Sequence, residues 1–145
     1  MILQEWQLNG SLVPHKTNAR EIKDLLALAD RDLKDCQSAG LSVDWRLNIA
    51  YNSALQSATA ALAAADYRAA RDSHHFRIIQ SLSLTIGASF SMVTQFDHSR
   101  KKTSAVMSAQ VLHRIRKLTR CITSPSNCAR IPKSGCAKII RIISQ

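Results

Sequence analysis

The sequence predicts an all-α protein: an up-and-down antiparallel bundle of about four helices, followed by an irregular, basic C-terminal tail. Apolar residues recur at helical spacing in four segments between residues 17 and 100. Three of these segments begin after a residue that favours the N-cap position, and short links between them favour antiparallel neighbours. No stretch of useful length alternates with a period of two, so we expect no sheet.

The first predicted helix begins after Asn18, a suitable N-cap, and Glu21 stands where it would complete a capping box. Gly40 marks the end of this segment. The apolar stripe of the helix consists of Ile22, Leu25, Leu26, Ala29, Leu33 and Cys36.

The second predicted helix is the longest and runs from Val43 to Asp66, with Ser42 as its cap and Asp44 in its first turn. Its C-terminal half is rich in alanine, which permits close approach of a neighbouring helix. Residues 67–72 are expected to form a short basic connection. The predicted buried face contains Leu47, Tyr51, Ala54, Leu55, Ala58, Leu62 and Ala65.

The third predicted helix follows Ser73 and ends near Gly87, and a fourth begins near Phe90 and reaches Arg100. Together with the first two helices they supply the expected core. The residues predicted to lie in or near this core are Leu25, Ala29, Leu33, Tyr51, Leu55, Leu62, Phe76, Ile79, Leu82, Val93 and Phe96.

Charge divides the chain into two parts. Residues 1–97 contain all ten acidic residues and nine of the twenty lysines and arginines, a net charge of −1. Residues 98–145 contain the other eleven basic residues and no acidic one. We therefore expect a helical body over residues 1–102 and a basic tail over residues 103–145. Such a tail could bind nucleic acid nonspecifically through phosphates.

Other features favour a cytoplasmic protein with reduced thiols. No apolar run approaches the ~20 residues of a membrane span. The N-terminus has no basic segment followed by an apolar one, so we expect no secretion signal. Three of the four cysteines, Cys121, Cys128 and Cys136, lie in the tail at spacings unlike those of zinc sites. We expect no metal site and no cofactor.

Several stretches resemble a bacterial branch of the HEPN superfamily (higher eukaryotes and prokaryotes nucleotide-binding). They are VPHKT at 13–17, LLALADRDLKD at 25–35, residues 40–71, HHFRIIQSL at 74–82 and FDHSRKK at 96–102. The resemblance implies an up-and-down helical bundle, often dimeric, in a superfamily of RNA-cleaving toxins and their inactive relatives. It also implies a possible nucleotidyltransferase-like partner protein.

The catalytic motif of that family is an Arg, four to six intervening residues and a His on the last long helix. Arg100 is the nearest candidate for the Arg, which would stabilise phosphate charge while the His acts as acid or base. The positions for the His hold Ala105, Val106 and Met107, and His113 lies too far along the chain. We therefore expect no ribonuclease activity.

Two further groups are candidates for ligand or partner contacts. His74 and His75 open the third helix and could contact a phosphate or nucleotide. We favour the simpler interpretation, in which one is a surface histidine and the other packs against a neighbouring helix. Asn48, Asn52 and Gln56 form a polar stripe on the second helix, with Arg46 and Arg77 expected nearby. This stripe could bind a ligand or a second copy, or be a solvated helix face.

Function is therefore expected to be that of a non-catalytic HEPN-type module in a toxin–antitoxin or RNA-related system. It would act through a homodimer, a partner protein, or a bound RNA or nucleotide. One alternative is an RNA-cleaving toxin whose active site is lost in this chain. Another is nonspecific nucleic-acid binding by the tail.

Back-translation offers a reason for the basic, irregular character of the sequence after Lys102. When ordinary codons from Thr103 onward are read after two bases are dropped, they give ERSYERAGTASDTEADEM, which is acidic and helix-periodic. The reading continues without a stop, resembles the usual C-terminal helix of the family, and places a Tyr rather than a His near the catalytic spacing. We interpret residues 103–145 as a frameshifted tail; the alternative is a genuine basic extension.

The DNA sequence around codon 102, in this gene and in close relatives, tests the frameshift. We expect the relatives to encode the acidic, helix-periodic sequence directly after this codon. Relatives that carry TSAVMSAQVLHR in frame would show that the basic extension is genuine.

Overall fold

The computed structural model describes residues 2–72 and 74–85, together with positions 87, 89–91, 93, 94 and 97. This part of the chain is mainly helical, and a small two-stranded sheet accompanies the helices. No helix among these residues is long and apolar enough to cross a membrane. The elements are α1 (Leu3–Leu8), β1 (Leu12–Pro14), α2 (Ala19–Asp35), α3 (Val43–Ala64), β2 (Tyr67–Ala69) and α4 (His74–Thr85).

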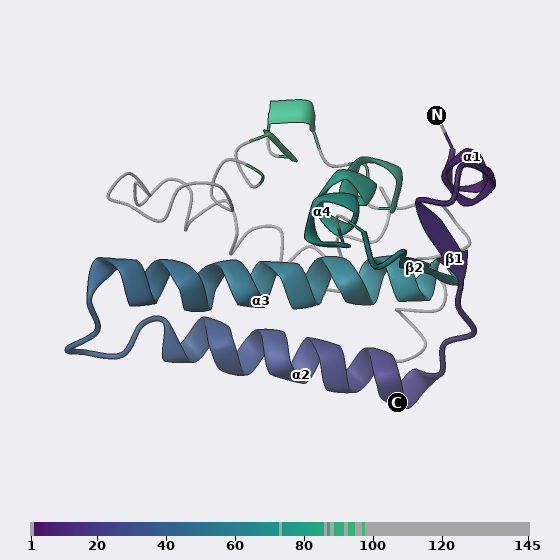
Figure 1. Cartoon of the computed structure of the whole chain (residues 1–145). Coiled ribbons are helices and arrows are strands. Elements are labelled where there is room, and N and C mark those ends of the chain that lie inside the picture. The colour runs from purple at the N-terminus through teal and green to yellow at the C-terminus, as the bar shows by residue number, and fades with distance from the viewer. Residues whose placement is uncertain are drawn as a thin grey trace.

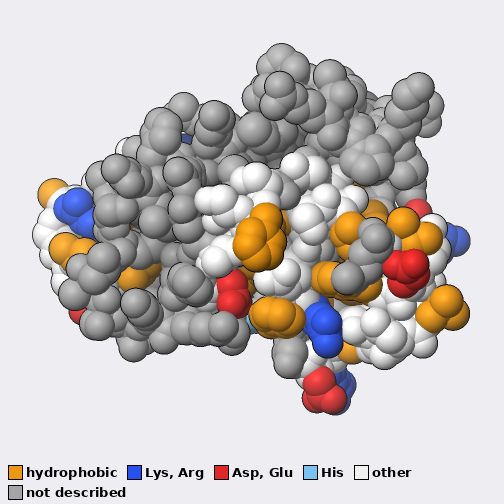
Figure 2. Space-filling view, turned by 90° about the horizontal axis from the view of Figure 1, so that it is seen from above, with side chains coloured by type: hydrophobic (Ala, Val, Ile, Leu, Met, Phe, Trp, Pro, Cys, Tyr) orange, Lys and Arg blue, Asp and Glu red, His pale blue; other side chains and the backbone are white. Residues whose placement is uncertain are grey.

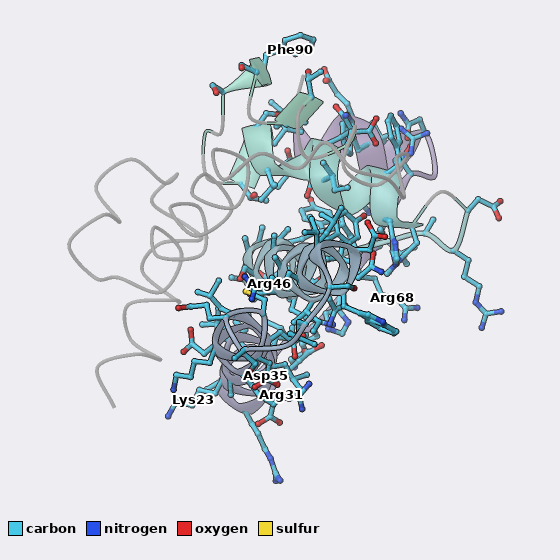
Figure 3. All side chains as sticks on the ribbon, turned by 90° about the vertical axis from the view of Figure 1, so that its left-hand side faces the viewer. Lys23, Arg31, Asp35, Arg46, Arg68 and Phe90 are labelled. Atoms are coloured by element: carbon cyan, nitrogen blue, oxygen red, sulfur yellow. The ribbon has the colours of Figure 1, made fainter. Side chains whose placement is uncertain are left out.

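Helices α2 and α3 form an antiparallel hairpin, and α4 packs on the other side of α3 (Figures 1 and 3). The hairpin has the antiparallel arrangement expected from the sequence. Helix α4 departs from it, because it crosses α3 instead of running alongside (Figures 1 and 3). Helix α3 is therefore the central layer, which explains why its alanine-rich C-terminal half is buried on several sides.

The predicted caps form at both long helices. The Asn18 side chain accepts a hydrogen bond from the Glu21 backbone at 2.9 Å, and Ser42 accepts one from the Trp45 backbone at 3.2 Å. Gly40 has a positive φ of 84° in the turn between them, a conformation that glycine adopts without a Cβ clash. Helix α3 ends at Ala64, slightly before the predicted boundary, because Asp66 adopts a left-handed φ of 68°.

The expectation that the body contains no sheet is wrong. Strands β1 and β2 pair antiparallel, with Leu12 opposite Ala69 and Pro14 opposite Tyr67. The connection predicted over residues 67–72 therefore contains a strand. Each strand has three residues, which is too short for an alternating pattern to stand out in the sequence. The pairing continues as Ala70 N–H donates to the Ser11 carbonyl at 3.0 Å.

The N-terminal helix α1 was also not expected from the sequence. It spans six residues, which is too short for a periodic signal, and it buries Trp6 against the core. Together with the sheet, α1 covers the end of the hairpin at which α3 finishes (Figure 1). Tertiary contacts rather than helical propensity therefore hold this short element in place.

The predicted core is confirmed where it falls on described residues. Ala29, Leu55, Leu62, Ile79, Leu82 and Val93 are buried, while Leu25, Leu33, Tyr51 and Phe76 are partly buried. Phe96 lies outside the described residues. Positions 90, 91, 93, 94 and 97 have helical backbone, within the predicted fourth helix, whereas Arg100 and residues 103–145 are outside the described part.

Seen from the α4 side, the described residues present hydrophobic side chains among backbone and other uncharged side chains, with charged groups toward the edges (Figure 2). Phe90, which is 84% exposed, belongs to this side of the fold (Figure 3). Charged side chains are more frequent on α2, which has nine of them in 17 residues.

Candidate functional site

Asp32 and Asn52 join α2 and α3 at one side of the hairpin. The Asn52 side-chain N–H donates to Asp32 Oδ2 at 2.6 Å, and Arg31 donates to Asp32 Oδ1 from Nη2 at 2.9 Å and from Nε at 3.2 Å. Asp32 is buried. A buried carboxyl group is costly unless it is paired and hydrogen-bonded, so the hydrogen bonds from Asn52 and Arg31 offset the cost of burying Asp32. One residue of the predicted polar stripe, Asn52, therefore helps to hold α2 and α3 together.

Of the rest of this stripe, Gln56 is partly buried, and Asn48 lies on an exposed surface that also includes a tryptophan. Trp45 is 63% exposed, and Asn48 is exposed as well. Trp45, Asn48 and Asn52 are spaced three and four residues apart, which places them on one face of α3. We call these three residues the contact face. Sequence reasoning missed Trp45, although its position three residues before Asn48 was the signal that could have found it.

Arg46 points to a different side of the hairpin. It lies between α2 and α3 near their connecting loop (Figure 3), and its Nη2 donates to the Ser38 carbonyl at 3.4 Å. Its Nε is buried and has no hydrogen-bond partner within the described part of the chain. Arg46 therefore ties the loop after α2 to the start of α3, and it does not join Asn48 and Asn52.

His74 and His75 begin α4, and both are exposed. The His75 ring lies 6.4 Å from the Tyr51 ring of α3 and 5.8 Å from the His74 ring, measured between centroids. Adjacent residues project in different directions from a helix, so only His75 reaches α3. This contact joins the start of α4 to the central helix.

Arg77 does not lie on the polar stripe either. Its guanidinium carbon is 5.8 Å from the Trp6 ring centroid and 5.6 Å from the Phe76 ring centroid. A cation over an aromatic face is attracted by the electron density of the ring. Arg77 thereby links α1 to α4, so its role in the structure is to hold the N-terminal helix.

A half-buried cluster that was not expected from the sequence lies at the start of α2. Glu21 does not fold back as in the expected capping box: its Oε1 and Oε2 lie 2.8 and 2.9 Å from His15 Nε2. The Thr17 hydroxyl also donates to Glu21 Oε2 at 2.7 Å. The hydrogen bond from Thr17, followed by the hydrogen bond and charge of His15, lowers the pKa of Glu21 against the opposing effect of burial.

The described candidate residues lie in four separate places and not in one constellation. Asn48 and Asn52 share the contact face, His74 and His75 lie with Tyr51, and Arg46 and Arg77 each hold a different junction; Arg100 lies outside the described residues. In the described part of the chain, no group of three or more His, Cys, Asp or Glu could hold a metal ion. Comparisons with protein-family models, curated proteins and solved structures gave no match.

We predict that Thr17→Val makes the stability of the protein less dependent on pH in the acidic range. A lowered folded-state pKa means that Glu21 contributes stability above its ordinary pKa of 4.5, which is lost as pH falls through the folded-state value. Thr17→Val raises that folded-state pKa. The variant should therefore be less stable than the parent at pH 7, by less than about 1 kcal/mol because Glu21 is partly exposed, and this difference should shrink as pH falls through the folded-state pKa.

Urea unfolding at several pH values between 7 and 3 measures this difference. Thr59→Val is a matched control, because the Thr59 hydroxyl donates to the Leu55 backbone carbonyl, at 2.8 Å, and a backbone carbonyl does not titrate. Its stability should differ from the parent by a constant amount across the range. A Thr17→Val profile parallel to that of the parent would contradict the assignment.

Proposed function

We propose that this chain is a non-catalytic helical module of the HEPN type, which acts by association in a toxin–antitoxin or RNA-related system. The stretches that resemble this superfamily coincide with packed elements. Residues 25–35 belong to α2, residues 40–71 include α3 and β2, and residues 74–82 belong to α4. The antiparallel α2–α3 hairpin is also in keeping with the up-and-down bundle that the resemblance implies.

The contact face is the observation that carries this proposal. Tryptophan is enriched where proteins bind one another, and the two amide side chains add hydrogen-bonding groups beside its large apolar area. Trp45 is 63% exposed, whereas Trp6 is buried in the core. A partner protein, such as a nucleotidyltransferase-like chain, or a second copy would cover this face.

The engagement of the other candidates supports binding over catalysis. Arg46 holds the loop after α2, and Arg77 lies against Trp6 and Phe76. These side chains already serve the fold. A reaction that used them would have to give up those contacts.

We predict that the purified chain leaves single-stranded RNA and transfer RNA intact, because no His follows Arg100 at the family spacing. Gel analysis of the RNA after incubation measures cleavage. Arg100→Ala and Lys102→Ala are compared in parallel, since both remove one positive charge from the same short segment. RNA cleavage that is abolished by Arg100→Ala and retained by Lys102→Ala would overturn the non-catalytic proposal.

A further inference from the structure

The outer surface of α2 carries a regular stripe of side chains that no described element covers. Helix α2 lies at the edge of the described fold with α3 on one side (Figure 1), and Arg31 and Asp35 lie on its outer side (Figure 3). Arg20, Asp24, Leu28, Arg31 and Asp35 are all exposed. Their spacings of four, four, three and four residues place them on one face of the helix. We call these five residues the α2 seam.

The charges of the α2 seam are reversed about its midpoint, which lies between Ala27 and Leu28. Arg20 and Asp35 stand at equal distances from this point, as do Asp24 and Arg31, and each pair joins opposite charges. A two-fold axis through the midpoint would place α2 of a second copy antiparallel to the first. Arg20 would then face Asp35 of the other copy, and Asp24 would face its Arg31.

The centre of the α2 seam is apolar. Leu28 is 37% exposed, although it is one of the large hydrophobic residues, and its neighbour Ala27 is small and exposed. In the antiparallel arrangement the two Leu28 side chains meet beside the axis, while the small Ala27 allows the helices to approach closely. An apolar centre with a charged rim is the ordinary anatomy of a protein–protein interface.

From this self-complementary pattern we propose that the α2 seam binds the α2 seam of a second copy of this chain in an isologous, antiparallel dimer. The inference rests on the proposed function, because it identifies self-association as one of the binding events. It places the second copy on α2 and leaves the contact face of α3 for a different partner.

The contacts within one chain leave the charged side chains of the α2 seam available to a second copy. Arg20 and Asp24 approach only to 3.9 Å, and their side chains remain 91% and 70% exposed. Arg31 donates to Asp32 but remains 62% exposed at its side chain, so the guanidinium can also donate to a second carboxylate. Exposed ion pairs are individually weak and screened by salt. The dimer should therefore dissociate more readily as the salt concentration rises.

Charge exchange at Arg20 and Asp35 tests the proposal in the full chain. Each of Arg20→Asp and Asp35→Arg places like charges opposite one another at both symmetry-related contacts. Neither should damage α2, because an acid in the first turn and a base in the last turn both suit the helix dipole. Sedimentation equilibrium in low salt should show dimerisation weakened about tenfold in each single variant. The double variant should recover the parent affinity to within about threefold.

Arg71→Asp is the matched control, since it makes the same charge change as Arg20→Asp at an exposed position outside α2. It should dimerise like the parent. A dimer that is unaffected by either single exchange, or that the double exchange does not restore, would overturn the α2 seam while leaving the proposed binding function standing. A chain that stays monomeric throughout would refute self-association itself, and with it this inference.

Discussion

The close approach of α2 and α3 is the contact on which the rest of the described structure depends. Ser53 is fully buried, and its hydroxyl donates to the Ala29 carbonyl of α2 at 2.6 Å. Three more small residues are buried on these two helices: Ala29 on α2, and Ala50 and Ser57 on α3. Small side chains let two helices come close, and a well-packed interior has no room for larger ones. The hydrogen bond to α2 also satisfies the buried Ser53 hydroxyl.

This close hairpin decides which side chains are buried and which remain exposed. It brings Asn52 within 2.6 Å of Asp32, so that a buried carboxylate is satisfied across the two helices. It also turns Trp45 and the outer side of α2 outward, where the proposed partner and the proposed second copy bind. The two surfaces therefore differ in character: one presents an aromatic and amides, the other alternating charges about Leu28.

Long helices could be predicted from the sequence because caps and periodicity act locally. Asn18 and Ser42 cap α2 and α3 as expected, and the buried Leu55, Leu62 and Leu82 follow from helical spacing. The short elements could not be predicted in this way, because three-residue strands and a six-residue helix are held by tertiary contacts and give no local periodic signal. For the same reason the sequence did not reveal that Arg77 lies over the Trp6 ring or that Glu21 pairs with His15. Arg100 lies outside the described residues, so its predicted place near the end of a helix stays a prediction.

Chemical denaturation of Ser53→Leu tests most directly whether the close α2–α3 contact underlies the fold. The larger side chain should force the helices apart and leave the Ala29 carbonyl without its donor, so we expect the free energy of unfolding to fall by at least about 2 kcal/mol. Ser83→Leu is the control, because Ser83 is exposed on α4, and its unfolding free energy should change by less than about 0.5 kcal/mol. Equal stabilities of the two variants would contradict the central role of this contact.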